Sequence, residues 1–335
     1  MAETADRQPL YRAKLTSLVR SHFLGPDGSG NQLEMADIVF STFPSGAIAR
    51  AGDEAWILLE GDDTRGAFGA GLVAVRDVPT VHFLVDGDAS QIALTALGFD
   101  PSPTVWSITG TDVAQAAPAP ATLPTSEVPP PGTSPFVDIL RARDLEIVVE
   151  QGVVIGELLG LEVGRVVASD DGATRLDVGV GAYDQDAFAI MNANLSPEGG
   201  LDLVCAEVRR HRDRSAEPHP INRLARERWL RAELVASPER CGLKRLAPVP
   251  SVRPRAGLKD TMATGALGTD ADGNVVVVVC SVGVDLDLVP TAADLIVRYK
   301  PDRVILVLPE RDQYPVITEL ASQLAVPTTF LSLDS

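Results

Sequence analysis

Residues 269–280 read Thr-Asp-Ala-Asp-Gly-Asn-Val-Val-Val-Val-Val-Cys. The Asp-Gly-Asn stretch at 272–274 predicts a tight turn, because these residue types tolerate a positive φ. The valine run that follows is typical of a strand that is covered on both faces of its sheet. Together with the apolar residues 263–268 before the turn, the stretch predicts a β-hairpin whose second strand lies inside an α/β fold.

The elements around this hairpin form an order that is repeated near the N-terminus. Towards the C-terminus we predict helix 220–235, strands 242–252, 263–268 and 275–280, then helix 288–298, strand 303–308, helix 312–324 and strand 328–333. Near the N-terminus we predict helix 10–23, strands 35–40, 47–50 and 55–60, then helix 62–75, strand 80–85, a helix and strand 104–109. Matching elements lie roughly 220 residues apart, and a near-constant offset indicates an internal repeat. The sequence therefore predicts a duplicated α/β domain.

The chain divides into four stretches by composition. We predict an N-terminal α/β domain at 1–111, a Pro-rich linker at 112–135, a middle α/β segment at 136–219 and a C-terminal α/β domain at 220–335. The linker is assigned because a stretch so rich in Pro and Ala is typical of a semi-extended spacer. Within the middle segment, residues 145–168 are apolar and carry four regularly spaced Gly. This pattern fits either a helix or a β-meander, and the Gly favour strands.

Composition indicates a cytoplasmic protein. The net charge of −17 disfavours binding of nucleic acid by the whole surface, because phosphates would be repelled. Three scattered Cys are too few for a disulfide framework or a Cys-based zinc site. No apolar stretch reaches membrane-spanning length, and the first residues lack the pattern of a signal peptide. We therefore expect a reducing compartment and no membrane partner.

One segment departs from this acidic balance. Residues 205–259 contain fourteen Lys or Arg and six Asp or Glu. Such a segment can contact an anionic partner such as nucleic acid. Alternatively, its Arg side chains pair with acidic residues of the same chain, which is the more common arrangement. The sequence favours the second interpretation and leaves the first open.

The order of helix, three strands with a tight hairpin, helix, strand, helix and strand resembles the restriction-endonuclease-like fold of the PD-(D/E)xK superfamily. The resemblance implies an Asp on the strand before the hairpin, and an acidic residue and a Lys at the end of the strand after it. Together these groups hold a divalent metal and activate water. In the C-terminal copy the corresponding places fall near Gly265 and at 279–281, which read Val-Cys-Ser. In the N-terminal copy they fall near Ala47 and at 60–62, which read Glu-Gly-Asp. The resemblance thus implies two catalytically degenerate copies.

Acidic residues gather where the third predicted strand ends. Glu60, Asp62 and Asp63 lie at the carboxyl end of a strand, where α/β sheets bind ligands. They are candidate ligand-binding residues, together with Ser281 at the matching place in the C-terminal copy. The alternative, which we prefer, is that these carboxylates cap the following helix and interact with its dipole.

The middle segment carries a second set of candidates. Glu157, Asp177, Glu207 and Arg209 form an E…D…E-x-R series that would suit a Mg²⁺-dependent nuclease. Against this, Ser196 and Pro197 predict the start of a helix that would contain Glu207. Arg is also a poor substitute for a Lys that must approach a metal-bound water.

We therefore expect an α/β protein with two duplicated restriction-endonuclease-like domains, each a mixed central sheet flanked by helices, and an intervening α/β segment. The expected role is non-catalytic and without a cofactor, as a scaffold or a binder of another protein. One alternative is a Mg²⁺-dependent nuclease that uses the basic segment to hold DNA or RNA. Another alternative is a protein that binds a small ligand, such as a nucleotide, at the carboxyl ends of the strands. The oligomeric state stays open.

Overall fold

The computed structural model describes residues 2–24, 37–61, 63–122, 132–150, 152–168, 173–181, 185, 190, 194–215, 217–251 and 261–333. The chain forms two compact units, each built from separate stretches of sequence. The first unit contains Met1–Ala121, Leu286–Lys300 and Gln313–Thr328. The second unit contains Thr122–Asp285, Pro301–Asp312 and Thr329–Ser335.

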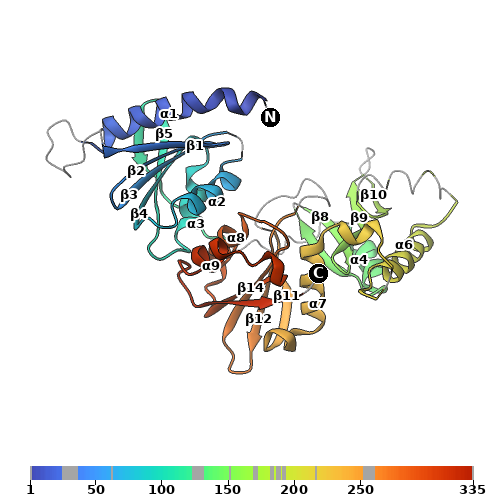
Figure 1. Cartoon of the computed structure of the whole chain (residues 1–335). Coiled ribbons are helices and arrows are strands. Elements are labelled where there is room, and N and C mark those ends of the chain that lie inside the picture. The colour runs from blue at the N-terminus through green and yellow to red at the C-terminus, as the bar shows by residue number, and fades with distance from the viewer. Residues whose placement is uncertain are drawn as a thin grey trace. The chain divides into compact units, whose positions relative to one another are not determined.

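The first unit contains a six-stranded sheet (Figure 1). Its strands are β1 (Val39–Phe43), β2 (Gly46–Ala51), β3 (Glu54–Leu59), β4 (Thr80–Val85), β5 (Thr104–Thr109) and β6 (Asp112–Gln115), in the order β1 to β6. The strands β1, β2 and β3 are antiparallel neighbours, whereas β3, β4 and β5 run parallel. The sheet is therefore mixed, as predicted.

Alternating side chains of the central strands bury both faces of this sheet. Trp56 and Leu58 pack with Leu15 of helix α1 (Ala2–His22) in one hydrophobic cluster. On the other face, Phe83 packs against Phe68 of helix α2 (Thr64–Ala74), with ring centroids 4.7 Å apart. Each strand thus carries two apolar faces, which is the reason for its continuous apolar run.

The Pro-rich linker is shorter than predicted. Asp112–Gln115 form the edge strand β6, which pairs antiparallel with β5 through a turn at Gly110. The prediction placed all of 112–135 in a spacer because of the prolines. The first of these is Pro118, so the backbone N–H groups of β6 are free to pair. At the other end, helix α4 (Ser134–Arg141) begins before the predicted boundary.

Two helices from the C-terminal part of the chain belong to the first unit. They are α8 (Leu288–Tyr299) and α9 (Pro315–Ala321). Helix α3 (Ala89–Ala96) packs on α8, and α2 packs on both α8 and α9. Figure 1 shows these four helices next to one another. Gly98, which follows α3, lies so close to Ala293 that a Cβ would overlap its backbone.

The second unit begins with an antiparallel sheet. Its strands are β7 (Glu146–Glu150), β8 (Val153–Leu158), β9 (Leu161–Ala168) and β10 (Thr174–Val178), in the order β10-β9-β8-β7. Residues 145–168 are therefore a meander, one of the two predicted alternatives. Gly152 and Gly160 have positive φ in its turns, and Gly156 pairs with Gly164 beneath Leu140 of α4. Helices α4 and α6 (Pro197–His211) supply the apolar side chains that cover this sheet.

A second mixed sheet follows in the same unit. Its strands are β11 (Leu243–Pro248), β12 (Thr264–Asp270), β13 (Val275–Cys280), β14 (Arg303–Leu308) and β15 (Thr328–Ser332), in sequence order. The predicted hairpin joins β12 to β13, and the Asp270 carboxylate accepts hydrogen bonds from the backbone of Asp272 and Asn274. Helix α7 (Arg226–Ala236) packs on one face of this sheet. The short helices η2 (Pro220–Arg223), η3 (Pro238–Cys241) and η4 (Glu310–Asp312) complete the described elements.

The structure confirms the α/β class and allows the two predicted copies to be compared. We call α1 to β5 the N-terminal series and α7 to β15 the C-terminal series. In both series the five strands lie in sequence order, with two antiparallel pairs followed by a parallel pair. This agreement is what a duplication requires, and a common origin stays a prediction. No described helix combines the length and apolar character needed to cross a membrane.

Candidate functional site

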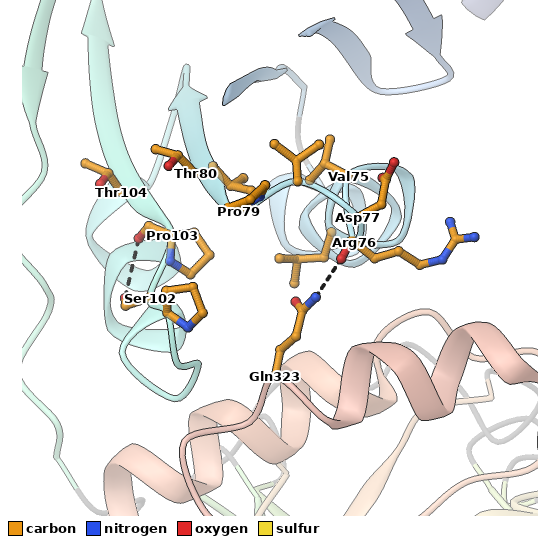
Figure 2. Close-up of a pocket in the computed structure, with 13 residues that line it drawn as sticks. Val75, Arg76, Asp77, Pro79, Thr80, Ser102, Pro103, Thr104 and Gln323 are labelled. Atoms are coloured by element: carbon orange, nitrogen blue, oxygen red, sulfur yellow. Dashed lines mark hydrogen bonds between the residues drawn. The ribbon is translucent and has the colours of Figure 1, made fainter. Parts of the chain in front are cut away.

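A hollow of about 400 Å³ lies in the first unit, where β4 and β5 begin (Figure 2). Two loops form most of its wall, at 75–81 before β4 and at 101–104 before β5. Leu72 of α2 and Gln323 complete it. The volume is in the range of a small-ligand pocket. The site lies at the amino ends of the parallel strands, opposite to the edge at which the sequence places its candidates.

The wall of the hollow is largely apolar, and its charged residues are paired. The apolar lining residues are Leu72, Val75, Val78, Pro79, Val81, Pro101 and Pro103. Arg76 is bonded to Glu319 at 2.6 Å, and Asp77 accepts two hydrogen bonds from Arg50. The Arg50 hydrogen bonds hold the pKa of Asp77 below its usual value. The hollow therefore offers an apolar recess without an unpaired charge.

Two polar side chains that line the hollow, Gln323 and Ser102, are bonded within the chain. The Gln323 side-chain amide donates to the Arg76 carbonyl oxygen at 2.8 Å, as the dashed line in Figure 2 shows. The Ser102 hydroxyl donates to the Ala96 carbonyl oxygen at 2.9 Å. These bonds fix the rim of the hollow, so it is suited to an uncharged, apolar group.

At the opposite edge of this sheet, Lys14 of α1 lies between two carboxylates. Its ammonium group donates to Glu60, which follows β3, and to Asp86, which follows β4, at 2.7 Å from the latter. Burial alone would lower the pKa of Lys14, but the hydrogen bonds to Asp86 and Glu60 outweigh burial, and the pKa is raised. A lysine with a raised pKa stays protonated, so it acts as a counter-ion for the two carboxylates rather than as a nucleophile.

The other candidates near Glu60 have a structural role or lie outside the description. Asp63 caps α2, and its carboxylate accepts a hydrogen bond from the backbone of Gly66 at 2.9 Å. The preferred prediction of a helix cap is confirmed for Asp63, whereas Glu60 instead pairs with Lys14. Asp62 lies outside the described residues.

Ser281, the candidate in the C-terminal series, is enclosed. Its side chain is buried, and its hydroxyl donates to Asp285 at 2.7 Å. Its backbone N–H donates to Val307 of β14. Close by, the Asp312 carboxylate accepts the Gly283 backbone N–H at 2.7 Å. The carboxyl ends of β13 and β14 are thus held together by bonds within the loops.

The remaining places that the endonuclease resemblance implies hold small or apolar residues. Ala47 lies on β2, Gly265 on β12, and Val279 with Cys280 on β13. Ala47, Val279 and Cys280 are fully buried, and burial raises the pKa of the Cys280 thiol. These side chains supply no carboxylate oxygen to a metal ion.

The candidates in the middle segment lie on separate elements. Glu157 on β8 is buried and pairs with Arg228 and with Arg231, the latter at 2.9 Å. Asp177 on β10 accepts two hydrogen bonds from Arg175. The strands β8 and β10 are separated by β9.

The two remaining members of this series lie on the predicted helix. Glu207 and Arg209 belong to α6, whose cap at Ser196 is confirmed. Glu207 bonds to His211 at 2.8 Å, and Arg209 donates to the Arg143 carbonyl oxygen. Among all described residues, no three His, Cys, Asp or Glu side chains are grouped so that they could hold a metal ion.

Several Arg side chains of the basic segment are used inside the fold. Arg212 is buried over the ring of Trp229 and donates to the carbonyl oxygens of Leu159, Ile221, Leu224 and Ala225. Arg214 and Arg240 both pair with Glu233. Residues 252–260 of the segment lie outside the described residues. The described contacts agree with the favoured interpretation, in which these arginines serve the fold.

Two features of the site were missed by sequence reasoning. Lys14 and Asp86 were not singled out, because neither stands near Glu60 in the sequence. Asp86 directly follows a predicted strand that runs parallel to β3. Because the carboxyl ends of parallel strands lie at the same edge of a sheet, this position could have indicated that Asp86 lies near Glu60. The hollow could not be inferred, because its wall combines two loops with Gln323 from a distant part of the chain.

No protein-family model, curated protein or solved structure matches this chain. The functional interpretation therefore rests on the residues of the chain itself.

Proposed function

We propose that this chain is a non-catalytic cytosolic protein that binds another protein or acts as a scaffold. One observation supports the proposal: at the places that the endonuclease resemblance assigns to a metal, the described polar side chains of both series are bonded within the chain. In the N-terminal series, the Lys14 ammonium pairs with both Glu60 and Asp86. In the C-terminal series, Ser281 is buried and bonded to Asp285. A scaffold role is supported because these polar side chains are paired within the chain, and no three described His, Cys, Asp or Glu side chains are grouped to hold a metal ion.

The hollow between the loops at 75–81 and 101–104 is the contact point that we assign to a partner protein. An apolar side chain of the partner would remove the recess from water and gain about 25 cal/mol for each Å² of apolar surface buried. The charged residues at the rim would stay paired with Glu319 and Arg50, so the partner needs no compensating charge. A residue such as Leu, Val or Phe in an uncharged segment fits this chemistry.

A nuclease assay tests the non-catalytic part of the proposal. The full chain is incubated with single- and double-stranded DNA and RNA in the presence of Mg²⁺ or Mn²⁺. We expect no cleavage above that of a buffer control. Metal-dependent cleavage that disappears in Glu60→Gln or in Glu207→Gln would overturn the proposal and assign the centre to the N-terminal series or to α6.

A peptide selection tests the binding part. Random peptides displayed on phage are selected on the full chain, and an enriched peptide is titrated by fluorescence anisotropy. We expect Val78→Arg, which fills the hollow, to weaken binding at least tenfold, or about 1.4 kcal/mol. Val39→Arg is the control, because Val39 is exposed on β1 and does not line the hollow. Equal loss in both variants, or no enriched peptide, would contradict the assignment of the hollow.

A further inference from the structure

The segments that follow α3 and α9 form an antiparallel bridge within the first unit. Helix α3 ends at Ala96 and helix α9 at Ala321, and these two helices occupy the same place in the two series. Phe99 is the third residue after its helix, and Leu324 is the third residue after its own. These two residues face each other across the bridge. Equivalent positions of the two series therefore meet.

The hydrogen bonds of this bridge are reciprocal. The Asp100 N–H donates to the Gln323 carbonyl oxygen at 2.8 Å, and the Ala325 N–H donates to the Gly98 carbonyl oxygen at 2.9 Å. Asp100 and Ala325 are each one residue past the centre of the bridge, whereas Gly98 and Gln323 are each one residue before it. If each residue is replaced by its counterpart in the other series, each of these two hydrogen bonds becomes the other one. A local two-fold axis between the two segments relates bonds in this way.

The contacts that join helices of different series follow the same pattern, although α3 and α8 share a more extensive contact than α9 and α2. In the two series α2 corresponds to α8, and α3 corresponds to α9. The contact between α3 and α8 is matched by the contact between α9 and α2, and the contact between α2 and α8 is its own counterpart. All of these contacts belong to the first unit. An interface in which one surface meets an equivalent surface is isologous, as in two-fold homodimers.

We propose that the α2–α3 surface and the α8–α9 surface form a dimer interface contained in one chain, and that a second copy of the chain can replace either surface. The proposal follows from the predicted duplication and is independent of what the hollow binds. The α2–α3 surface can pack against an α8–α9 surface of its own chain or of another copy. Covalent linkage favours the contact within one chain, because linked segments meet at an effective concentration of about 1 mM. We therefore expect the contact between two chains to be detectable when the contact within each chain is blocked.

A complementation experiment with two full-length variants tests this. The first carries Gly98→Arg, which blocks its α2–α3 surface, together with Leu324→Cys. The second carries Ala293→Arg, which blocks its α8–α9 surface, together with Phe99→Cys. Only the mixture offers one intact surface of each kind, and it brings the introduced cysteine of one chain opposite the introduced cysteine of the other.

We expect mild oxidation of the mixture to give a disulfide-linked dimer of twice 35.5 kDa, with each variant alone remaining monomeric. Phe99 and Leu324 form a non-hydrogen-bonded antiparallel pair, for which the Cα atoms lie about 4.5 Å apart, within the range of a disulfide. The native Cys205, Cys241 and Cys280 are buried and do not compete in the folded protein.

Two controls make the result decisive. Leu97→Cys replaces Phe99→Cys in the second variant, because Leu97 is exposed and does not face Leu324, and this mixture should stay unlinked. Circular dichroism checks that each variant is folded. If the Gly98→Arg variant is unfolded, Gly98→Ala takes its place, because the alanine Cβ would already overlap the Ala293 backbone and block the contact. A mixture of folded variants that gives no dimer, or one that links Leu97→Cys equally well, would overturn the proposal.

Discussion

Lys14 of α1 and Arg231 of helix α7 are each bound by two carboxylates, yet their surroundings differ. Lys14, Glu60 and Asp86 keep 28%, 21% and 49% of their side chains exposed. In the second unit, the Glu157 side chain is fully buried between Arg228 and Arg231, and Glu146 completes the group at 3.1 Å from Arg231. We call these the Lys14 cluster and the Glu157 cluster. The same kind of ion pair is therefore a surface feature in one unit and a core feature in the other.

The difference shows why charge in a sequence is a poor guide to a binding surface. The Glu157 cluster joins β8 of the middle sheet to α7, so two arginines of the basic segment hold the second unit together. The Lys14 cluster lies at the carboxyl ends of β3 and β4, where α/β sheets bind ligands, but both of its carboxylates are already hydrogen-bonded to the lysine. Four substitutions break or sharpen this comparison.

Glu157→Gln should have the largest effect. The amide keeps the shape of the side chain but leaves Arg228 and Arg231 buried without this carboxylate. We expect the free energy of unfolding to fall by about 3–5 kcal/mol, measured by urea denaturation. Asp177→Asn, on the same sheet, removes a more exposed pair with Arg175 and should cost at most about 1 kcal/mol. Equal losses in the two variants would refute the distinction between buried and exposed pairs.

Arg212→Lys should be the next most harmful change. A lysine has no planar fork of donors and leaves several of the four buried carbonyl oxygens unsatisfied. We expect a loss of about 2–3 kcal/mol in the urea experiment. Arg209→Lys removes one hydrogen bond to the Arg143 carbonyl oxygen and should change the free energy of unfolding little. If Arg212→Lys were as stable as the wild type and instead lost affinity for nucleic acid, the arginine would serve a ligand and not the fold.

Lys14→Met should cost about 1 kcal/mol or less, because the cluster is partly exposed to water and salt. The pKa of Lys14 is raised, so its contribution is fully present at neutral pH. That contribution is lost as the pH rises above about 10.4 and passes through the value in the folded state. The difference in melting temperature between the wild type and Lys14→Met should therefore shrink above about pH 10. Lys14→Arg, which keeps the charge, is the control.

Glu146→Gln should have the smallest effect and the opposite sign. Burial raises the pKa of Glu146 despite the opposing charge of Arg231, so ionisation is disfavoured in the folded state. The stability contributed by Glu146 therefore falls as the pH rises above about 4.3, the value in the unfolded chain. We expect the variant to match the wild type near pH 4 and to equal or exceed it near pH 7, as seen in thermal unfolding. A variant that is clearly less stable at pH 7 would show that the hydrogen bond to Arg231 outweighs burial.

Strands with long apolar runs were well predicted from the sequence. The strands at 80–85, 104–109, 275–280 and 303–308 have the predicted bounds, because each is a short stretch rich in β-branched, aromatic or aliphatic residues between polar segments. The glycine-rich middle segment stayed ambiguous, since its spacing fits two periods. The antiparallel pairing of β7, β8 and β9 and the positive φ of Gly152 and Gly160 show that these glycines lie in turns. Strand β6 was missed because the neighbouring prolines dominated the composition.

The candidate site was less predictable, because it depends on contacts between distant residues. The sequence located the strand end at Glu60 but not the cation that neutralises it, which comes from a helix 46 residues earlier. It singled out Glu157 as a possible catalytic acid, since a carboxylate on a strand does not reveal the arginines that enclose it. Pairings of this kind are set by packing in three dimensions and leave no local pattern.

The two sides of the bridge between Phe99 and Leu324 can accumulate different substitutions during evolution. In a homodimer, every substitution appears on both sides of the two-fold axis. In a single chain the two sides are separate segments of sequence, so each can be substituted independently. Gly98 lies tightly against Ala293, whereas Gln323, at the matching position, sends its side chain to Arg76 and shapes the hollow. If the two series share the predicted common origin, one has diverged towards close packing and the other towards forming a recess, which identical subunits cannot do.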